Sequence, residues 1–213
     1  MIKYFVRTTG ERTLDESFQQ IDYELLVDTE HKPVKSFIDQ VMYLTSLNCE
    51  VVILEDDVVL CRDFKARIEK IIEDNPIDTI NFFYEPNWYF ESTIEKPSVW
   101  HQCVYYSINA LNILNTNLKH FNKDMKFKHY DVVARFALLN KCMCYYPRPC
   151  LVQHLDFDSI IGNIPGNRTT PYFIDYLEDL GIDYKDAKEH KEKLVEYKNK
   201  WFEKYAKNRL HSS

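Results

Sequence analysis

The sequence predicts an α/β fold in which helices flank a mixed, mainly parallel sheet and a C-terminal helix packs on that core. Over residues 1–84, apolar β-branched runs alternate with amphipathic segments, an order typical of mainly parallel sheets. A second observation is the acidic run Glu55-Asp56-Asp57, which follows an apolar strand directly. The chain has 213 residues without an internal repeat or linker, so we expect one domain over residues 1–213.

The first 84 residues are expected to form alternating strands and helices. β-Branched and aromatic residues predict strands at residues 3–8, 22–28, 51–54, 58–60 and 79–84. Apolar side chains at helical spacing predict helices at residues 14–20, 33–46 and 63–74, with Pro33 at a position that favours a helix start. Asp28 ends the second strand, where a carboxylate can accept a ribose hydroxyl or a base N–H. A solvated turn is the alternative for that residue.

The second half begins with an irregular aromatic stretch, residues 85–97, whose rings can stack on a sugar or a base, or cap the core. Strands are expected at residues 99–107, 143–146 and 151–154, and helices at residues 108–115, 131–140, 171–180 and 184–207. Gly181 ends the helix at 171–180. The last helix has an apolar stripe that favours packing on the domain, formed by Ala187, Leu194, Tyr197, Trp201 and Tyr205.

Charge and cysteine usage narrow the class of protein. The net charge is −6, but residues 119–148 carry seven basic and two acidic side chains, and residues 184–213 carry nine and five. An acidic front half with two basic patches is compatible with a metal site that faces an anionic partner. No apolar run approaches the roughly 18 residues of a membrane span, and the first residues lack the pattern of a signal peptide. The six cysteines have no paired CxxC spacing, which favours reduced thiols and a cytoplasmic protein.

The acidic run suggests a metal site. Three adjacent carboxylates at the carboxyl end of an apolar strand repel one another and resist desolvation. A bound cation relieves both penalties, and Mg²⁺ or Mn²⁺ takes carboxylate oxygens while leaving positions for substrate phosphates. Arg7 and Arg12 flank the polar loop after the first strand and are candidates for binding phosphate. The alternatives are a solvated acidic turn and an ordinary strand-to-helix loop.

Leu54-Glu55-Asp56-Asp57-Val58 resembles the acidic metal motif of GT-A glycosyltransferases, usually written D-x-D, in a variant familiar from small bacterial and phage-encoded enzymes. Residues 5–9, Phe-Val-Arg-Thr-Thr, look like the first strand and nucleotide loop of that fold. Residues 149–154 and 158–163 resemble the late strand and loop that supply a metal-binding histidine and a phosphate-contacting lid. The resemblance covers residues 1–175 and departs from the pattern in having Glu55 where a first Asp is common.

The resemblance implies a GT-A-like fold in which different parts of the chain have different functions. Residues 1–84 would hold the nucleotide sugar and metal, residues 85–175 the acceptor and the catalytic residue, and residues 184–207 the C-terminal helix. Mn²⁺ or Mg²⁺ would bind Asp57 and His154, and Asp131 would be the general base. The residues assigned to the nucleotide sugar are Thr8, Thr9, Arg7, Arg12, Asp28, Glu55, Asp56 and Arg168. A structural role for His154 and a helix cap for Asp131 remain alternatives.

The implied activity is metal-dependent transfer of a hexose, with glucose from UDP-glucose as the expected donor, to a hydroxyl acceptor. The basic stretches slightly favour a hydroxymethylated pyrimidine in phage DNA, modified in the host cytoplasm. A cell-surface glycan or a protein is the alternative acceptor. A metal-dependent nucleotidyltransferase and a non-catalytic α/β binding module are the rival functions. A haloacid-dehalogenase-like phosphatase is disfavoured, because the spacing of its two acidic residues is not met.

Overall fold

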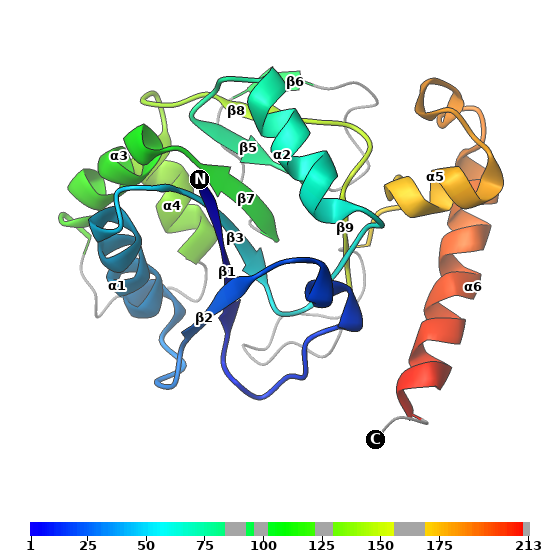
Figure 1. Cartoon of the computed structure of the whole chain (residues 1–213), viewed down its shortest axis with the longest axis horizontal. Helices are drawn as coiled ribbons and strands as arrows, with labels where there is room; N and C mark the ends of the chain where they lie inside the picture. The colour runs from blue at the N-terminus through cyan, green and yellow to red at the C-terminus, as the bar shows by residue number, and fades with distance from the viewer. Residues whose placement is uncertain (84–92, 96–101, 122–129, 156–168, 211–213) are drawn as a thin grey trace.

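The computed structural model describes residues 1–83, 93–95, 102–121, 130–155 and 169–210. In these residues a seven-stranded sheet lies between two sets of helices (Figure 1). The strands are β1 (Ile2–Thr8), β2 (Tyr23–Val27), β3 (Glu50–Glu55), β4 (Val58–Leu60), β5 (Thr79–Asn81), β6 (Thr93–Glu95), β7 (Cys103–Tyr106), β8 (Cys144–Tyr146) and β9 (Val152–His154). The helices are α1 (Pro33–Ser46), α2 (Phe64–Asp74), α3 (Ile108–Leu118), α4 (Tyr130–Leu138), α5 (Ile174–Leu180) and α6 (Lys191–Leu210), with 3₁₀ turns η1 (Glu16–Gln20) and η2 (Tyr184–Asp186).

The sheet is mixed and mainly parallel, which confirms the predicted fold class. Its order is β2-β1-β3-β7-β5-β8-β6. Strands β2, β1, β3, β5 and β8 run in one direction, while β7 and β6 run in the other. The chain reaches β7 only after β5, and it inserts β7 antiparallel between β3 and β5. Local patterning identifies β7 as a strand but contains no information about this insertion.

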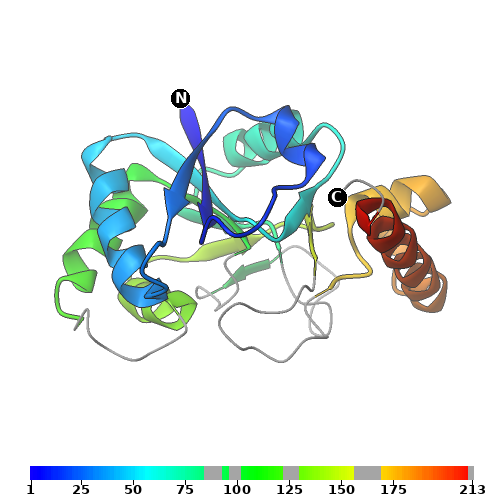
Figure 2. The ribbon, with the colours of Figure 1, turned by 90° about the horizontal axis from the view of Figure 1, so that it is seen from below.

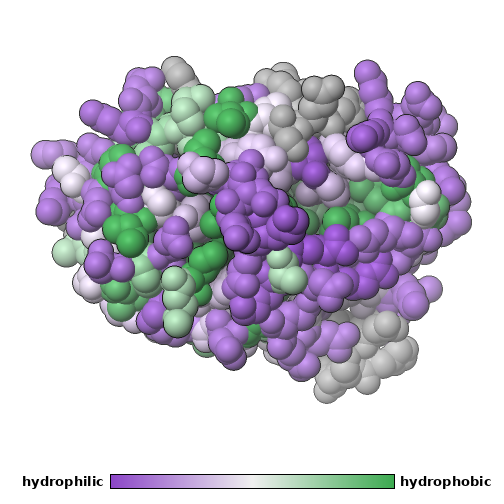
Figure 3. Space-filling view, turned by 45° about the horizontal axis from the view of Figure 1, so that its top comes forward, coloured by the Kyte–Doolittle hydropathy of each residue, from purple (hydrophilic) through white to green (hydrophobic). Residues whose placement is uncertain are grey.

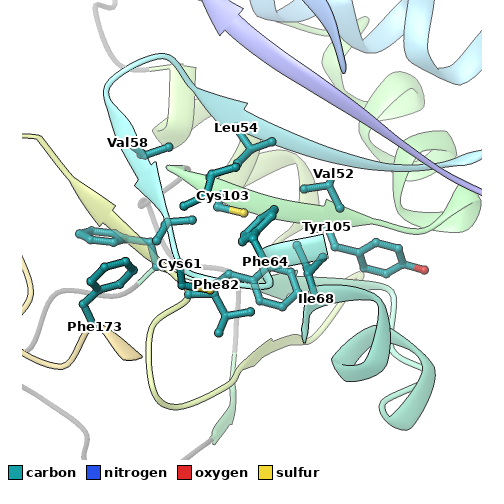
Figure 4. Packing of buried hydrophobic residues seen from close by; sticks show 14 of the residues in the cluster. Val52, Leu54, Val58, Cys61, Phe64, Ile68, Phe82, Cys103, Tyr105 and Phe173 are labelled. Carbon is teal, nitrogen blue, oxygen red and sulfur yellow. The ribbon is translucent and has the colours of Figure 1, made fainter. Parts of the chain in front are cut away.

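Both faces of the sheet are covered by apolar clusters. Side chains alternate along each strand, so a central strand contributes to both clusters. Val52 and Leu54 of β3 face a cluster that includes Phe64 and Ile68 of α2 (Figure 4). Val51 and Ile53, on the other face, join a cluster formed with α1, α3 and α4. A strand with both faces buried needs a continuous apolar sequence, which explains why residues 51–54 show no polar alternation.

The order of the first three strands creates a switch point between β1 and β3. From β1 the chain passes through η1 to β2 on one side, and from β2 it returns through α1 to β3 on the other side. Because η1 and α1 contribute to the two opposite core clusters, these connections cover opposite faces of the sheet. In open α/β sheets, ligands bind outside the carboxyl ends of the strands at such a point.

A two-stranded sheet brings the late part of the chain to this point. β4 pairs antiparallel with β9, so that Val58 lies opposite His154 and Val59 opposite Gln153. The Gln153 side chain is buried and satisfied: its Nε2 donates to the Thr170 carbonyl at 2.7 Å, and its Oε1 accepts from the Thr170 N–H at 2.9 Å. β9 is therefore held on both sides, and the position of His154 is fixed by backbone pairing.

The C-terminal region differs from the single helix predicted at residues 184–207. η2 is followed by a separate helix, α6, which begins at Lys191. Residues 188–190 carry no apolar side chain, so nothing buries a helical turn there and the chain breaks. Leu194 is buried, and Tyr197 and Trp201 pack beside it on the cluster that includes α5. α5 and α6 lie side by side at one edge of the molecule (Figure 2).

The predicted helix at residues 14–20 is also shorter than expected. It is the 3₁₀ turn η1, in which Asp15 caps the Ser17 N–H and Phe18 supplies the buried side chain. Among the described residues no helix is both long and apolar enough to cross a membrane. All six cysteines are free. Figure 3 shows a largely hydrophilic face on which apolar side chains are scattered in separate groups.

Candidate functional site

Three carboxylates, Glu55, Asp56 and Asp57, lie at the carboxyl ends of β1 and β3; we call them the acidic cluster. Glu55 is the last residue of β3, and Asp56 and Asp57 form the turn into β4. The parallel register places Arg7 of β1 opposite Glu55. The predicted nucleotide loop and the acidic run are therefore neighbours at the switch point of the sheet.

Arg7 connects the acidic cluster to α1 and α4. Its side chain is buried, donates from Nη1 to Glu55 Oε1 at 3.3 Å, and donates from Nε to Gln40 Oε1 at 2.7 Å. Its guanidinium carbon lies 3.6 Å from the centroid of the Tyr130 ring, a cation–π contact. The Tyr130 hydroxyl also donates to Glu55. Glu55 is therefore engaged by protein groups on two sides.

The Glu55 carboxyl is the least acidic group of the cluster. Burial raises its pKa to about 8, although the charge of Arg7 opposes this, and the negative charges of Asp57, Asp56 and Asp131 add to the increase. At neutral pH the side chain is therefore largely protonated in the folded protein.

This shift predicts a pH dependence of stability that Glu55→Gln removes. The folded-state pKa lies above the unfolded value, so the contribution of Glu55 is complete below about pH 4.5 and is lost as pH rises through about 8. Between pH 5 and pH 8.5, wild type should lose unfolding free energy relative to Glu55→Gln, by about 1.4 kcal/mol for each unit of pKa difference. Urea denaturation of both proteins across this range measures it. A difference that does not change with pH would contradict the shift.

Asp56 and Asp57 share the guanidinium of Arg12. Arg12 Nη1 lies 3.1 Å from Asp56 Oδ1 and 2.8 Å from Asp57 Oδ2. Asp56 also accepts a hydrogen bond of 2.6 Å from Thr8 Oγ1, at the end of β1. Burial raises the pKa of Asp56, while Thr8 and Arg12 oppose the increase. Burial opposes ionisation of Asp57 too, but His154 and Arg12 outweigh it and lower the Asp57 pKa to about 2.

His154 reaches the acidic cluster from β9. Its Nε2 lies 3.4 Å from Asp57 Oδ2, and the residue is 3% exposed. Its Nδ1 is buried and has no hydrogen-bond partner among the described residues. An imidazole with one loose contact and one unsatisfied nitrogen differs from a core histidine that is fixed by short hydrogen bonds. The structure thus brings together two side chains, Asp57 and His154, that the sequence predicted as metal ligands.

Three further predicted residues, Thr9, Asp131 and Arg168, differ in how the structure places them. Thr9 directly follows β1, and its buried Oγ1 has no hydrogen-bond partner in the described part of the chain. Asp131 is in the first turn of α4, where its Oδ1 accepts from the Val132 N–H at 2.9 Å, and its charge acts on Glu55. Arg168 lies outside the described residues, as do residues 158–163 and residues 122–129 of the basic region 119–148.

Asp28 follows β2, where its N–H donates to the Thr8 carbonyl at 2.8 Å, and it lines a pocket between β2 and α1. The pocket has a volume of about 310 Å³ and is lined by residues that include Asp28, Lys32, Lys35 and Gln40. Asp28 Oδ1 accepts from the Lys32 N–H at 3.2 Å. Gln40 joins the pocket to the cluster, because it also accepts from Arg7. A ligand that extends from this pocket to the acidic cluster would follow the carboxyl edge of the sheet.

Three residues of the site were not predicted from the sequence: Gln40, Gln102 and Tyr130. The Gln102 carbonyl accepts from the Glu55 N–H at 3.0 Å, and its buried side-chain oxygen has no partner among the described residues. Tyr130 directly precedes Asp131, the predicted general base. No sequence signal distinguishes Gln40 from an ordinary polar residue of an amphipathic helix.

The donor set suits a cation that is completed by substrate. No group of three or more His, Cys, Asp or Glu side chains in the described ranges is arranged to hold a metal ion. Asp57 and His154 offer a carboxylate oxygen and an imidazole nitrogen. Mg²⁺ is commonly held by one or two carboxylates, with waters and substrate phosphates as its remaining ligands. Asp57 supplies the carboxylate of that pattern, beside the loop that the sequence predicts to bind phosphate, and His154 adds a nitrogen ligand.

Comparison with known proteins adds little to this geometry. No protein-family model and no curated protein matches the chain. Among solved structures, the crystal structure of A197 from STIV is similar over 71% of this chain and 83% of its own, with 10% sequence identity and a TM-score of 0.43. The residues at the switch point of the sheet are therefore the basis for assigning a function.

Proposed function

We propose that the protein is a divalent-cation-dependent glycosyltransferase that binds a nucleotide-sugar donor at the acidic cluster. The observation that carries this proposal is the convergence of Arg7, Arg12, the three carboxylates and His154 on the switch point between β1 and β3. Arginines beside carboxylates can hold a diphosphate together with its cation. The resemblance of residues 54–58 to the GT-A metal motif supports the same assignment.

Each residue has a distinct task in this proposal. Asp57 and His154 would hold Mn²⁺ or Mg²⁺, and the bound cation would supply positive charge beside the diphosphate leaving group. Arg12 and Arg7 bind phosphate oxygens and exclude water from them. Asp28 and the pocket beside β2 receive the nucleoside. Asp131, at the start of α4, accepts the proton of the acceptor hydroxyl.

The expected donor is UDP-glucose, and the expected acceptor is a hydroxymethylated pyrimidine in DNA. Support for the acceptor is electrostatic: residues 119–148 carry seven basic and two acidic side chains, a pattern that suits a phosphate backbone. Binding to hydroxymethylated duplex should then weaken steeply with added salt. Glucose transfer to glycans without any transfer to such DNA would reject this acceptor and retain the enzyme class.

A thermal-shift screen of nucleotide sugars, with and without MnCl₂, tests the donor site. A donor at one hundred times its Kd stabilises the folded state by about 2.7 kcal/mol, and we expect the largest shift when donor and Mn²⁺ are present together. Product analysis then separates the enzyme classes. A glycosyltransferase releases a nucleoside diphosphate, a nucleotidyltransferase releases pyrophosphate, and a binding module releases neither. Absence of any stabilisation across the panel would reject the proposal.

A further inference from the structure

The Arg12 guanidinium holds the two aspartates of the acidic cluster together. A single nitrogen, Nη1, contacts Asp56 Oδ1 at 3.1 Å and Asp57 Oδ2 at 2.8 Å. The Arg12 and Asp57 side chains are each 17% exposed and that of Asp56 is 7% exposed, so these contacts are poorly screened by solvent. A positive group is therefore already in contact with the Asp57 carboxylate, which the proposed function assigns to the divalent cation.

We propose that Arg12 is the resident cation of the Asp56–Asp57 pair, and that it makes tight binding of a divalent cation depend on the binding of a diphosphate. This inference rests on the proposed function and adds a coupling between its two ligands. It assigns to Arg12 a role in the ligand-free protein as well as in the complex.

The charges of the site support this coupling. Arg7 contacts Glu55 rather than the two aspartates, so Arg12 is the arginine in contact with the Asp56–Asp57 pair among the described residues. Two carboxylates and one guanidinium sum to one negative charge. A divalent cation that joins this group leaves an excess of positive charge and is repelled by the guanidinium. The negative charge of a diphosphate removes that excess of positive charge. The diphosphate oxygens can also accept hydrogen bonds from Arg12 in place of the aspartate oxygens.

The loop that carries Arg12 is anchored at both ends. At its start, the Gly10 N–H donates to Thr8 Oγ1 at 2.9 Å, and Gly10 has a positive φ of 82° that favours glycine. At its end, Asp15 caps η1 and accepts from the hydroxyl of Tyr205 on α6. Between these two hydrogen-bonded ends, Arg12 itself belongs to neither a helix nor a strand. Its long side chain can therefore change partners while β1 and η1 remain in place.

The coupling is reciprocal, as thermodynamic linkage requires: Mn²⁺ should strengthen UDP binding by the same factor by which UDP strengthens Mn²⁺ binding. Couplings between ligands typically amount to about 5- to 150-fold, and we expect wild type to fall in that range. Arg12→Gln keeps a polar side chain, although a shorter one, and removes the charge. In this variant Mn²⁺ alone should bind at least about fivefold more tightly, and the coupling factor should fall toward one.

The experiment measures two equilibria on the full chain. Binding of Mn²⁺ alone is followed by the electron paramagnetic resonance signal of free Mn²⁺. Binding of UDP is measured by calorimetry in EDTA and in saturating MnCl₂, and the ratio of the two Kd values is the coupling factor. Arg12→Lys retains the charge and should keep most of the coupling. Arg62→Gln is the matched control, because Arg62 makes its carboxylate contacts with α5 and should bind both ligands as wild type does.

The outcomes separate this inference from the proposed function. Tighter binding of Mn²⁺ alone to Arg12→Gln, together with a smaller coupling factor, supports it. Unchanged or weaker Mn²⁺ binding in that variant, with normal coupling in wild type, overturns the role of Arg12 and leaves the proposed function standing. If Arg12→Gln fails to fold, loss of coupling in the charge-retaining Arg12→Lys overturns the inference. Wild type that binds neither Mn²⁺ nor UDP overturns both.

Discussion

Asp57→Asn should lower the rate of nucleoside diphosphate release by about three orders of magnitude while the fold persists. The substitution preserves the shape of the side chain and removes its charge. With a pKa of about 2, Asp57 is fully ionised at neutral pH and supplies the negative charge that faces both Arg12 and His154. Loss of one preorganised electrostatic group at a reacting centre typically costs on the order of 10²–10³ in rate, and loss of bound cation adds to this.

A control for this substitution lies six residues further along the chain. Asp63→Asn makes the same chemical change at an exposed residue whose side chain forms no capping hydrogen bond, and its φ of 53° is one that Asn accepts readily. This variant should retain wild-type turnover. Rates are compared at saturating donor and Mn²⁺, after circular dichroism shows that both variants are folded. Equal turnover in Asp57→Asn and wild type would remove Asp57 from the mechanism.

Phe64→Ala should lower the free energy of unfolding by about 3–5 kcal/mol, the usual cost of truncating a large buried aromatic side chain. Phe64 is the first residue of α2 and is completely buried. Its ring lies among Val52, Leu54 and Cys103 on one face of the sheet (Figure 4). Truncation leaves a cavity under the strand that carries the acidic cluster, so we expect the cation site to lose affinity as the protein loses stability.

Phe136→Ala provides the comparison. Phe136 lies on α4 and is 60% exposed, so its truncation removes little buried surface and should change stability by no more than about 0.5 kcal/mol. Urea denaturation at constant pH gives both values, and an unchanged m-value shows that the unfolded states are comparable. Similar losses from the two substitutions would contradict the assignment of Phe64 to the core.

Local patterning located most elements because each pattern reflects a local physical requirement. The helix at residues 33–46 has its predicted limits, since Pro33 favours a first turn and apolar side chains recur on one face. The run at residues 51–54 had to be a doubly buried strand, because no polar residue interrupts it. The break before α6 was not predicted, because the apolar stripe continues in register on both sides of the polar residues 188–190.

In the candidate site, local sequence patterns predicted the residues but not the long-range contacts between them. The sequence indicated that three carboxylates follow a strand at the ligand-binding edge of a sheet, and that His154 ends a later strand. It contained no information that β4 and β9 would pair and place His154 beside Asp57, or that Tyr130 would donate to Glu55.

By itself, the sequence determined the α/β class, the faces of the strands and the position of the acidic run. These depend on the spacing of apolar side chains within a few residues. Only the tertiary structure decided that Arg12 would form ion pairs with both Asp56 and Asp57, and that β7 would enter the sheet antiparallel. Those outcomes depend on which distant segments pair, and pairing is set by the burial and hydrogen bonding of the whole sheet rather than by any local pattern.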